Sequence, residues 1–250
     1  MAPNFQRLGD AGQRVLRAAR KTAKAPHFGL DISATLHWQE EAIWHEETKL
    51  HPYNQTMTVE VRPATPERWN DLVTVFGRRG DDPSWCWCRL FYCSTCELTA
   101  SEPKPDNRSA LRQEITHAAV APGLIAYVND QPLGWTRVGP RSAFPRVNDN
   151  RALAKVLTVD PGAWWVTCFA VNNSHRRSGI GSTLLEAAVL FAREHGATVV
   201  EGHPVDVTAL RAARVGGSSI FTGTMAMFSN AGFTEVGRTF PSRPVMRLLV

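Results

Sequence analysis

The chain has 250 residues, which is enough for one domain with an extension or for two small domains. Hydrophobic residues make up 43% of it and charged residues 20%, a composition that supplies a packed core and excludes an intrinsically disordered protein. No apolar run approaches the roughly 20 residues that a membrane span needs, so a membrane protein is not expected. The formal net charge of +5 suits an anionic ligand and is too small to indicate binding to nucleic acid.

The cysteines favour a reducing compartment. There are five, an odd number, and four of them lie between Cys86 and Cys96. No apolar segment of the signal-peptide type precedes them, so a framework of secreted-type disulfides is not favoured. We therefore expect a cytoplasmic protein in a reduced setting.

Residues 1–56 are predicted to form an N-terminal extension that is partly helical or disordered. Residues 1–26 carry six basic side chains against a single acidic one, and residues 31–51 are acidic. A solvated, frayed helix is the favoured interpretation of the basic segment, and an arm for RNA or a membrane surface is the alternative. Lys49 stands where the zinc-protease motif H-E-x-x-H requires histidine, which excludes that motif. Met57 directly precedes the first predicted strand and would also suit a translation start.

From residue 57 onward the pattern is that of a folded domain. In chain order the first expected elements are a strand over 58–62, a helix over 65–76, a helix over 106–119 and a β-hairpin over 122–138. Asn129-Asp130 is the predicted turn of the hairpin.

The second half of the chain is predicted to alternate strands and helices. In chain order the expected elements are a strand over 165–171, a helix over 181–195, a strand over 197–205, a short helix over 224–232, and strands over 234–238 and 245–250. Gly196 would end the long helix as its C-cap. This order predicts a mixed α/β domain with a β-α-β unit in its middle.

The loop inside that β-α-β unit gives the clearest functional signal. It reads NNSHRRSGIG, in which Arg176-x-x-Gly179-x-Gly181 directly precedes the helix. Glycines at a helix N-terminus let main-chain N–H groups approach a phosphate. A P-loop is excluded, because no lysine follows Gly181. A dinucleotide fingerprint with Glu201 as its ribose-binding acid is a closer rival, but six residues separate the strand from Ser178 and too few β-α units follow.

This motif resembles the [R/Q]-x-x-G-x-[G/A] signature of the GNAT superfamily of N-acetyltransferases. The preceding strand, the amphipathic helix and a late A-G-F turn at 231–233 extend the resemblance over residues 57–250, which would form the acetyltransferase domain. The stretches C-W-C at 86–88 and F-T-G-T…M-F…A-G-F at 221–233 are similar to a subgroup of the family. The resemblance implies an α/β (α+β) fold with a mixed, mostly antiparallel central sheet, flanking helices and a central β-α-β unit that binds acetyl-CoA.

The resemblance also implies which residues contact coenzyme A. Main-chain groups at the end of the strand would pair with the pantetheine arm, and the loop and its arginines would hold the phosphates. Two later hydroxyl groups could also reach the coenzyme. The expected ligands are Phe169, Ala170, Val171, Arg176, Arg177, Ser178, Gly179, Ile180, Gly181, Ser182, Thr222 and Thr224.

The usual catalytic side chains of the family are missing. Many members place a general-acid tyrosine where this chain has Phe228, and some place a glutamate base where it has Trp165. The nearest substitutes are Glu201 and His203, which strand alternation would place on one face. Either could accept the proton, directly or through water, and a structural role for both is the alternative.

Aromatic residues are expected to line the acceptor site, with simple core packing as the alternative. The candidates, from regions that line this site in the family, are Trp85, Trp87, Tyr92 and Trp135. A four-thiolate zinc site is another reading of the cysteines, although C-x-C is an unusual spacing and the aromatic residues among them favour packing. The residues concerned are Cys86, Cys88, Cys93 and Cys96, and no metal is expected.

The sequence therefore predicts an acetyl-CoA-dependent N-acetyltransferase that moves an acetyl group to a primary amine by direct attack in a ternary complex. The acceptor would be a small molecule or a peptide. A homodimer is compatible with the sequence, and neither nucleic acid nor a membrane is expected as a partner. A non-catalytic acyl-CoA-binding or sensor module of the same fold is the alternative, because the usual tyrosine and glutamate are absent.

Overall fold

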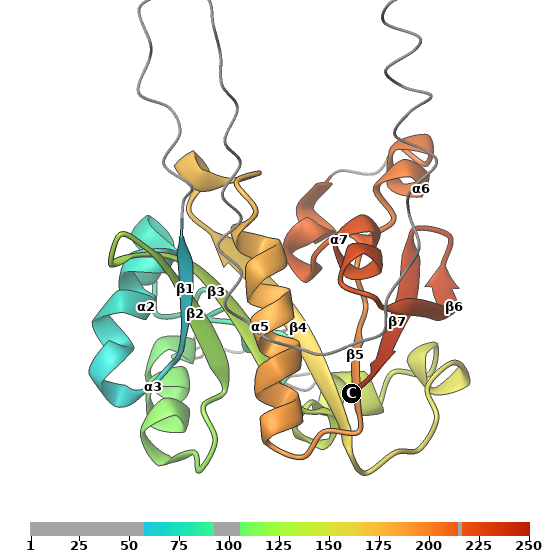
Figure 1. Ribbon diagram of the computed structural model, residues 1–250, viewed down its shortest axis with the longest axis horizontal. Coiled ribbons are helices and arrows are strands. Elements are labelled where there is room, and N and C mark those ends of the chain that lie inside the picture. Colours follow the sequence, from blue (N-terminus) through green and yellow to red (C-terminus); the bar gives the residue numbers. More distant parts are fainter. Residues whose placement is uncertain (1–57, 93–105, 215–216) are drawn as a thin grey trace, which may run out of the picture. The chain divides into compact units, whose positions relative to one another are not determined.

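The computed structural model describes residues 58–92, 106–214 and 217–250. The predicted extension over 1–56 and its boundary at residue 57 lie outside these residues. The described chain forms a seven-stranded sheet in the order β1-β2-β3-β4-β5-β7-β6 (Figure 1). Every neighbouring pair is antiparallel except β4 and β5. The predicted mixed, mostly antiparallel α/β fold is confirmed.

The predicted strands and helices of the described chain are all present, with shifted ends. The strands are β1 (Val59–Pro63), β2 (Gly123–Val128), β3 (Gln131–Pro140), β4 (Ala163–Val171), β5 (Val199–Gly202), β6 (Thr234–Phe240) and β7 (Arg243–Leu249). The α-helices are α2 (Trp69–Phe76), α3 (Asn107–His117), α4 (Pro145–Asn148), α5 (Ile180–Glu194), α6 (Val207–Ala212) and α7 (Met225–Asn230). Short 3₁₀ helices are η1 (Pro66–Arg68), η2 (Gly77–Asp81), η3 (Arg141–Ala143), η4 (Leu153–Lys155), η5 (Asn173–His175) and η6 (Gly217–Thr222).

The elements that the sequence did not predict are short. They are α4, α6 and the 3₁₀ helices other than η1, each of at most six residues. A helix of one or two turns is too short to show apolar periodicity, so the sequence pattern does not predict it. The strand predicted over 197–205 is also shorter than expected, because pairing stops at Gly202.

The hairpin of β2 and β3 turns where the sequence predicts. Asn129 and Asp130 both have positive φ, 50° and 58°, as a type I′ turn requires. The two strands alternate between the faces of the sheet: Leu124 and Ala126 belong to one core cluster, Ile125 and Tyr127 to another. The sheet therefore has a hydrophobic core on each side.

Helix α5 connects the parallel strands β4 and β5 and covers one face of the sheet (Figure 1). Its apolar residues recur every three or four positions and form the centre of the first core cluster; those that are buried are Ile180, Leu184, Leu185, Ala188, Phe191 and Ala192. Gly196, with φ of 83°, follows the helix as predicted. None of the described helices combines the length and the apolar character that crossing a membrane requires.

Helices α2 and α3 cover part of the opposite face. Trp69, Leu72 and Phe76 of α2 pack with Leu111 and Ile115 of α3 in the second cluster. A third, smaller cluster beside it contains Phe144, Trp165 and Val245, and joins the loops after β3 to β4 and β7.

Gly134 of β3 is the point of closest approach between α5 and the sheet. A methyl group there would lie 2.7 Å from Ile180 Cγ2 and 3.0 Å from Leu184 Cδ1. We expect Gly134→Ala to lower the free energy of unfolding by about 1–3 kcal/mol through overpacking. Gly139→Ala is the matched control on the same strand, because its methyl group would meet the Phe144 ring at 3.7 Å, an ordinary contact. Urea denaturation of the two variants checks this, and equal stabilities would contradict the packing argument.

Candidate functional site

The C-terminal half of β4 is paired on one side only. Strand β5 pairs with β4 from Ala163 to Val166, and β3 alone pairs with β4 beyond that point. A β-bulge makes Thr167 the extra residue of β4, between the pairs formed by Val166 and Cys168. The sheet therefore opens between β4 and β5 at this end.

Strand alternation decides which main-chain groups face this opening. The Asn172 N–H donates to the Leu133 carbonyl of β3 at 2.8 Å. Two residues earlier, Ala170 likewise directs its main-chain groups to β3, and Phe169 and Val171 direct theirs to the open side. Of the three strand residues predicted to bind the coenzyme, Phe169 and Val171 therefore present free main-chain groups, whereas Ala170 is committed to the sheet.

The glycine loop brings the predicted phosphate ligands together at the N-terminus of α5. Ser178 Oγ donates to the His175 carbonyl at 2.6 Å and closes the loop. Gly179 is the N-cap of α5, with φ of 88°, and a Cβ there would meet nothing within 4 Å. The first main-chain hydrogen bond of the helix runs from the Thr183 N–H to the Gly179 carbonyl. The N–H groups of residues 180–182 consequently point out of the helix without an intrahelical partner.

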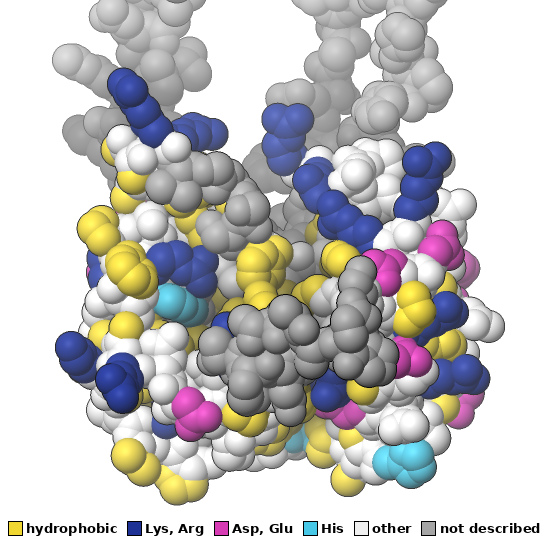
Figure 2. All heavy atoms as spheres, turned by 180° about the vertical axis from the view of Figure 1, so that it is seen from behind, with side chains coloured by type: hydrophobic (Ala, Val, Ile, Leu, Met, Phe, Trp, Pro, Cys, Tyr) yellow, Lys and Arg dark blue, Asp and Glu magenta, His cyan; other side chains and the backbone are white. Residues whose placement is uncertain are grey.

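The surroundings of this helix end are basic. Arg176 and Arg177 are exposed in the loop, and Arg211 and Arg214 are exposed at the end of α6. Figure 2 shows Lys and Arg side chains gathered along the end of the molecule where the loop and α6 lie. This charge, together with the helix dipole, favours a polyanionic ligand.

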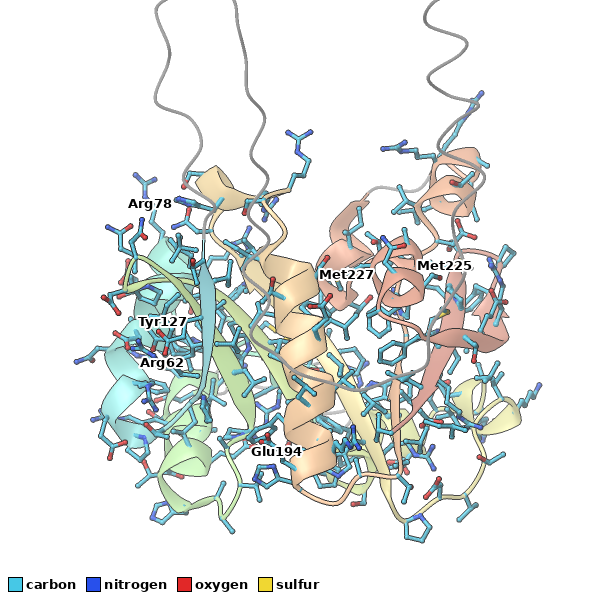
Figure 3. All side chains as sticks on the ribbon, in the orientation of Figure 1. Arg62, Arg78, Tyr127, Glu194, Met225 and Met227 are labelled. Atoms are coloured by element: carbon cyan, nitrogen blue, oxygen red, sulfur yellow. The ribbon has the colours of Figure 1, made fainter. Side chains whose placement is uncertain are left out.

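An apolar wall formed by α7 faces the glycine loop. Phe228 is fully buried, lies 6.3 Å from the Phe169 ring centroid and covers Gly202, where a Cβ would meet the Phe228 ring at 2.4 Å. Met227 of α7 points toward α5, and its sulfur lies 3.4 Å from where a Cβ of Gly181 would be (Figure 3). The position of the family's tyrosine is therefore filled by a phenyl ring without an ionisable group.

The two predicted threonine ligands already have partners in the protein. Thr224 Oγ1 accepts a hydrogen bond from the Met227 N–H at 3.2 Å, as the N-cap of α7. Thr222 is buried, and its Oγ1 accepts from Arg243 Nη1 at 3.0 Å. Both hydroxyl groups stabilise the fold of this wall, which leaves them less capacity to bind a ligand.

Glu201, one of the two predicted bases, is a fully buried anion held by two arginines. Its Oε2 accepts from Arg141 Nη1 at 2.5 Å, and its Oε1 accepts from Arg247 Nη2 at 2.6 Å and Nε at 2.9 Å. The Thr158 carbonyl and hydroxyl accept from the same two guanidinium groups. Both carboxylate oxygens are occupied, so this geometry favours the structural role over proton abstraction.

His203, the other predicted base, is separate from Glu201. Strand β5 ends at Gly202, and the His203 ring instead contacts Thr239 and Arg243. Its Nδ1 accepts from Arg243 Nη2 at 3.3 Å, which leaves the Nε2–H to donate to Thr239 Oγ1 at 2.8 Å. Burial and the adjacent Arg243 lower the pKa of His203 to about 4. The imidazole is neutral near pH 7, with both nitrogens hydrogen-bonded.

Most of the aromatic residues predicted to line the acceptor site are in the core. Trp87 and Trp135 have no exposed surface, and Trp87 stacks on Trp69 at 5.6 Å between centroids. Trp85 packs edge-on against Phe76 at 5.1 Å. The packing alternative thus describes these three residues, because the second core cluster needs large rings between α2 and the sheet.

Tyr92 is the exception among the predicted acceptor residues, because it borders a group of buried charges. The Arg137 guanidinium stacks on the Tyr92 ring at 3.9 Å and donates from Nη2 to Glu114 Oε1. Arg137 is fully buried, and its Nε and Nη1 have no hydrogen-bond partner among the described residues. The contact between Arg137 and Glu114 could not be predicted from the sequence, because residues 23 positions apart on a helix and a strand share no local pattern.

Two of the four cysteines of the zinc alternative, Cys93 and Cys96, lie outside the described residues. Within the described ranges, no group of three or more His, Cys, Asp or Glu side chains is arranged to hold a metal ion. The described cysteines, Cys86, Cys88 and Cys168, are free thiols.

A sheet that opens beside a glycine-rich helix N-terminus is the arrangement that the resemblance to acetyl-CoA-dependent transferases predicts. The sequence profile of the acetyltransferase (GNAT) family matches residues 87–216, which is more than half of the chain. The chain belongs to this family of acetyltransferases, whose acetyl donor is acetyl-CoA and whose acceptors are amines.

Several solved acetyltransferase structures are similar to this chain at low sequence identity. The GNAT domain of S. lividans PAT is 18% identical with a TM-score of 0.45, over 77% of this chain and 90% of that one. Aminoglycoside acetyltransferase AAC(6')-Ib in complex with coenzyme A is 17% identical, with a TM-score of 0.44 over 77% and 95% of the two chains. Ribosomal-protein-alanine N-acetyltransferase from Brucella melitensis is 18% identical, with a TM-score of 0.43 over 76% and 99%. No curated protein matches the sequence.

The two arginines around Glu201 make a direct stability prediction. Glu201→Gln would leave two guanidinium groups without their shared carboxylate in a buried site, and we expect the free energy of unfolding to fall by about 3–5 kcal/mol. Glu60→Gln is the matched control, because Glu60 forms an exposed ion pair with Arg62 and its loss should not change stability measurably. Chemical denaturation measures both variants, and a neutral effect of Glu201→Gln would contradict a structural role.

His203 makes a prediction on acid stability. Its pKa of about 4 in the folded protein lies below the roughly 6.5 of an unfolded histidine, so between these values only the unfolded chain binds the proton. The free energy of unfolding should therefore decrease as the pH falls through this window, by at most about 1.4 kcal/mol per pH unit from this residue. His203→Gln should lose less stability than the wild type between about pH 7 and pH 5 in urea denaturation. His117→Gln, at an exposed position on α3, should retain the wild-type dependence.

Proposed function

We propose that the chain is an acetyl-CoA-dependent N-acetyltransferase that transfers an acetyl group to a primary amine by direct attack in a ternary complex. The observation that supports this most is the opening between β4 and β5, which places the free main-chain groups of Phe169 and Val171 beside the uncapped N-terminus of α5. One surface thus offers hydrogen bonds to an extended amide-containing arm and an anion site at its end.

The residues of the loop fit coenzyme A. The N–H groups of residues 180–182 would bind the pyrophosphate, with Gly179 and Gly181 allowing close approach of the main chain. Arg176 and Arg177 supply mobile positive charge for the remaining phosphate. Phe169 and Val171 would pair with the amides of the pantetheine arm as a neighbouring strand would.

Acetyl-CoA, when bound, supplies an activated thioester. The chain would polarise the thioester carbonyl with a main-chain N–H of the open strand, Phe169 being the residue nearest the last β4–β5 pair that faces the opening. Phe228 and Phe169 exclude water from one side of the site. Because Glu201 is ion-paired and the pKa of His203 is about 4, we propose that water accepts the ammonium proton.

The acceptor would bind on the side of the sheet away from α5, near Tyr92 and Arg137. This proposal is supported by the position of α5, which covers the other face, and by the partly exposed Tyr92 ring, against which the buried Arg137 guanidinium stacks. A small-molecule amine and a peptide amine both suit such a polar wall.

A non-catalytic acyl-CoA-binding module is the second candidate function. Phe228 and Trp165 occupy the positions where relatives carry a tyrosine acid and a glutamate base, and both are buried in apolar clusters. Such a protein would bind the coenzyme through the same loop without turning it over.

The anion site makes a binding prediction. Gly181→Glu would place a carboxylate at the uncapped end of α5, where it repels phosphates and fills the approach of the main chain. We expect the affinity for acetyl-CoA, measured by isothermal titration calorimetry, to fall at least about 100-fold while the thermal unfolding curve stays that of a folded protein. An unchanged affinity would overturn the assignment of the site.

Leu190→Glu is the matched control on the same helix. Leu190 is 58% exposed and lies nine residues, about 13 Å along the helix, from Gly181. The Leu190→Glu substitution adds the same charge away from the anion site and should leave the affinity for acetyl-CoA unchanged. Thiol release from acetyl-CoA across a panel of primary amines then decides between the two candidate functions, since turnover supports the transferase and binding without turnover supports the sensor.

A further inference from the structure

Three thiols form a contiguous chain of sulfur atoms beneath the sheet. Cys168 of β4 places its Sγ 2.7 Å from the Sγ of Cys88, which lies 80 residues earlier in the chain. Cys88 is in turn hydrogen-bonded to Cys86 and accepts from Trp135 Nε1 at 2.9 Å. Cys88 and Cys168 are each 5% exposed, whereas Cys86 is only half-buried. The chain of sulfurs therefore runs from the surface into the core.

The backbone around Cys86 is shaped to hold an anion. Trp87 and Cys88 both have positive φ, 40° and 53°, although neither is glycine. This turn directs the N–H groups of Cys88 and Leu90 toward the Cys86 sulfur, and the Arg89 N–H donates to the Cys86 carbonyl at 2.7 Å. Successive N–H groups that converge in this way form an anion-binding concavity.

The members of this cluster differ in protonation. The Cys88 thiol and the surrounding N–H groups lower the pKa of Cys86 to about 6, although burial acts in the opposite direction. Burial and the adjacent thiols raise the pKa of Cys88 above its usual range. The accessible sulfur is thus the thiolate, and thiolates are the sulfur species that react with peroxides.

We propose that Cys86, Cys88 and Cys168 form a peroxide-reactive site whose final product is a disulfide between Cys88 and Cys168. The Cys86 thiolate attacks one peroxide oxygen, which breaks the O–O bond and yields a sulfenic acid and hydroxide. This hydroxide removes the Cys88 proton as water, and the Cys88 thiolate attacks the Cys86 sulfur, forming an S–S bond and releasing a second hydroxide. Hydroxide removes the Cys168 proton, and the Cys168 thiolate attacks the Cys88 sulfur and expels the Cys86 thiolate. Two thiols and one hydrogen peroxide give one disulfide and two waters.

The order of these steps follows from position and leaving-group character. Cys88 lies between the other two sulfurs, so it is the one that can bond to either. The low-pKa Cys86 thiolate is the better leaving group, which directs the last exchange toward the Cys88–Cys168 disulfide. Cys168 immediately precedes the open half of β4, so this disulfide would fix the turn at 86–88 to the strand that, on the proposed function, binds the acetyl donor.

Mass spectrometry of the full chain tests this site. Reduced protein is treated with an equimolar amount of hydrogen peroxide, blocked with N-ethylmaleimide and digested with trypsin. We expect a cross-linked peptide pair whose fragmentation on either side of Trp87 assigns the bond to Cys88 and Cys168. Cys86→Ser should slow its formation at least about tenfold, because the accessible thiolate is lost. The double variant Cys93→Ser/Cys96→Ser is the matched control and should form it at the wild-type rate.

A 1,3-diketone probe for sulfenic acid provides a second measurement that needs no variant. It should label Cys86 of the wild-type protein before any other cysteine. First labelling elsewhere, a disulfide that joins Cys86 or Cys88 to Cys93 or Cys96, or a wild-type rate in Cys86→Ser would overturn the proposal. None of these readouts depends on acetyl transfer, so a failure here is distinct from a failure of the proposed function.

Discussion

Main-chain pairing between β4 and β5 stops after Val166 and Gly202, and the whole candidate site depends on this interruption. Two local features explain it. Pro204 has no N–H to continue the ladder, and the Phe228 ring covers Gly202 so closely that no side chain fits there. Beyond this point β4 keeps one free edge, with α7 and η6 as its new neighbours. A ligand that can act as a strand replaces the missing hydrogen bonds.

The buried charge at the end of the paired region keeps this arrangement in place. Glu201 lies one residue before the interruption and binds Arg141 from η3 and Arg247 from β7. Both arginines also donate to Thr158, so four segments of the chain, the strand of Glu201 included, are joined in one hydrogen-bonded network. Burying charges is costly unless they are paired and hydrogen-bonded, and here both oxygens are. The same contacts that make Glu201 structurally important make it unsuitable as a base.

Donor binding and proton transfer rest on different kinds of groups in this protein. The proposed donor contacts are almost all main-chain groups, placed by the strand and the helix, and they tolerate the loss of the family's usual side-chain catalysts. The positions of those catalysts, Trp165 and Phe228, instead contribute rings to two core clusters. On the proposed function, a transferase with this site would rely on polarisation and positioning, and water would take the proton.

The parts of the site that consist of main-chain groups could be predicted from the sequence, whereas the surroundings of its side chains could not. The strand at 165–171, the loop with Arg176 to Gly181 and the helix after it were predictable, because each is specified by neighbouring residues: apolar periodicity, glycine conformation and capping. The burial of the tryptophans that were expected to line the acceptor site was not predictable. Trp87 and Trp135 are 48 positions apart and both pack against Phe76. Aromatic residues in a strand or turn look the same in sequence whether they pack inward or contact a ligand.

The sequence by itself determined the order of elements, the mixed sheet and the glycine loop at the start of α5, since these follow from local propensities and spacing. Only the tertiary structure decided the roles of Glu201 and His203. Their partners lie 36 to 60 residues away, at Thr239, Arg243, Arg141 and Arg247. The protonation and availability of a buried polar group depend on what surrounds it in space, and no local pattern records that.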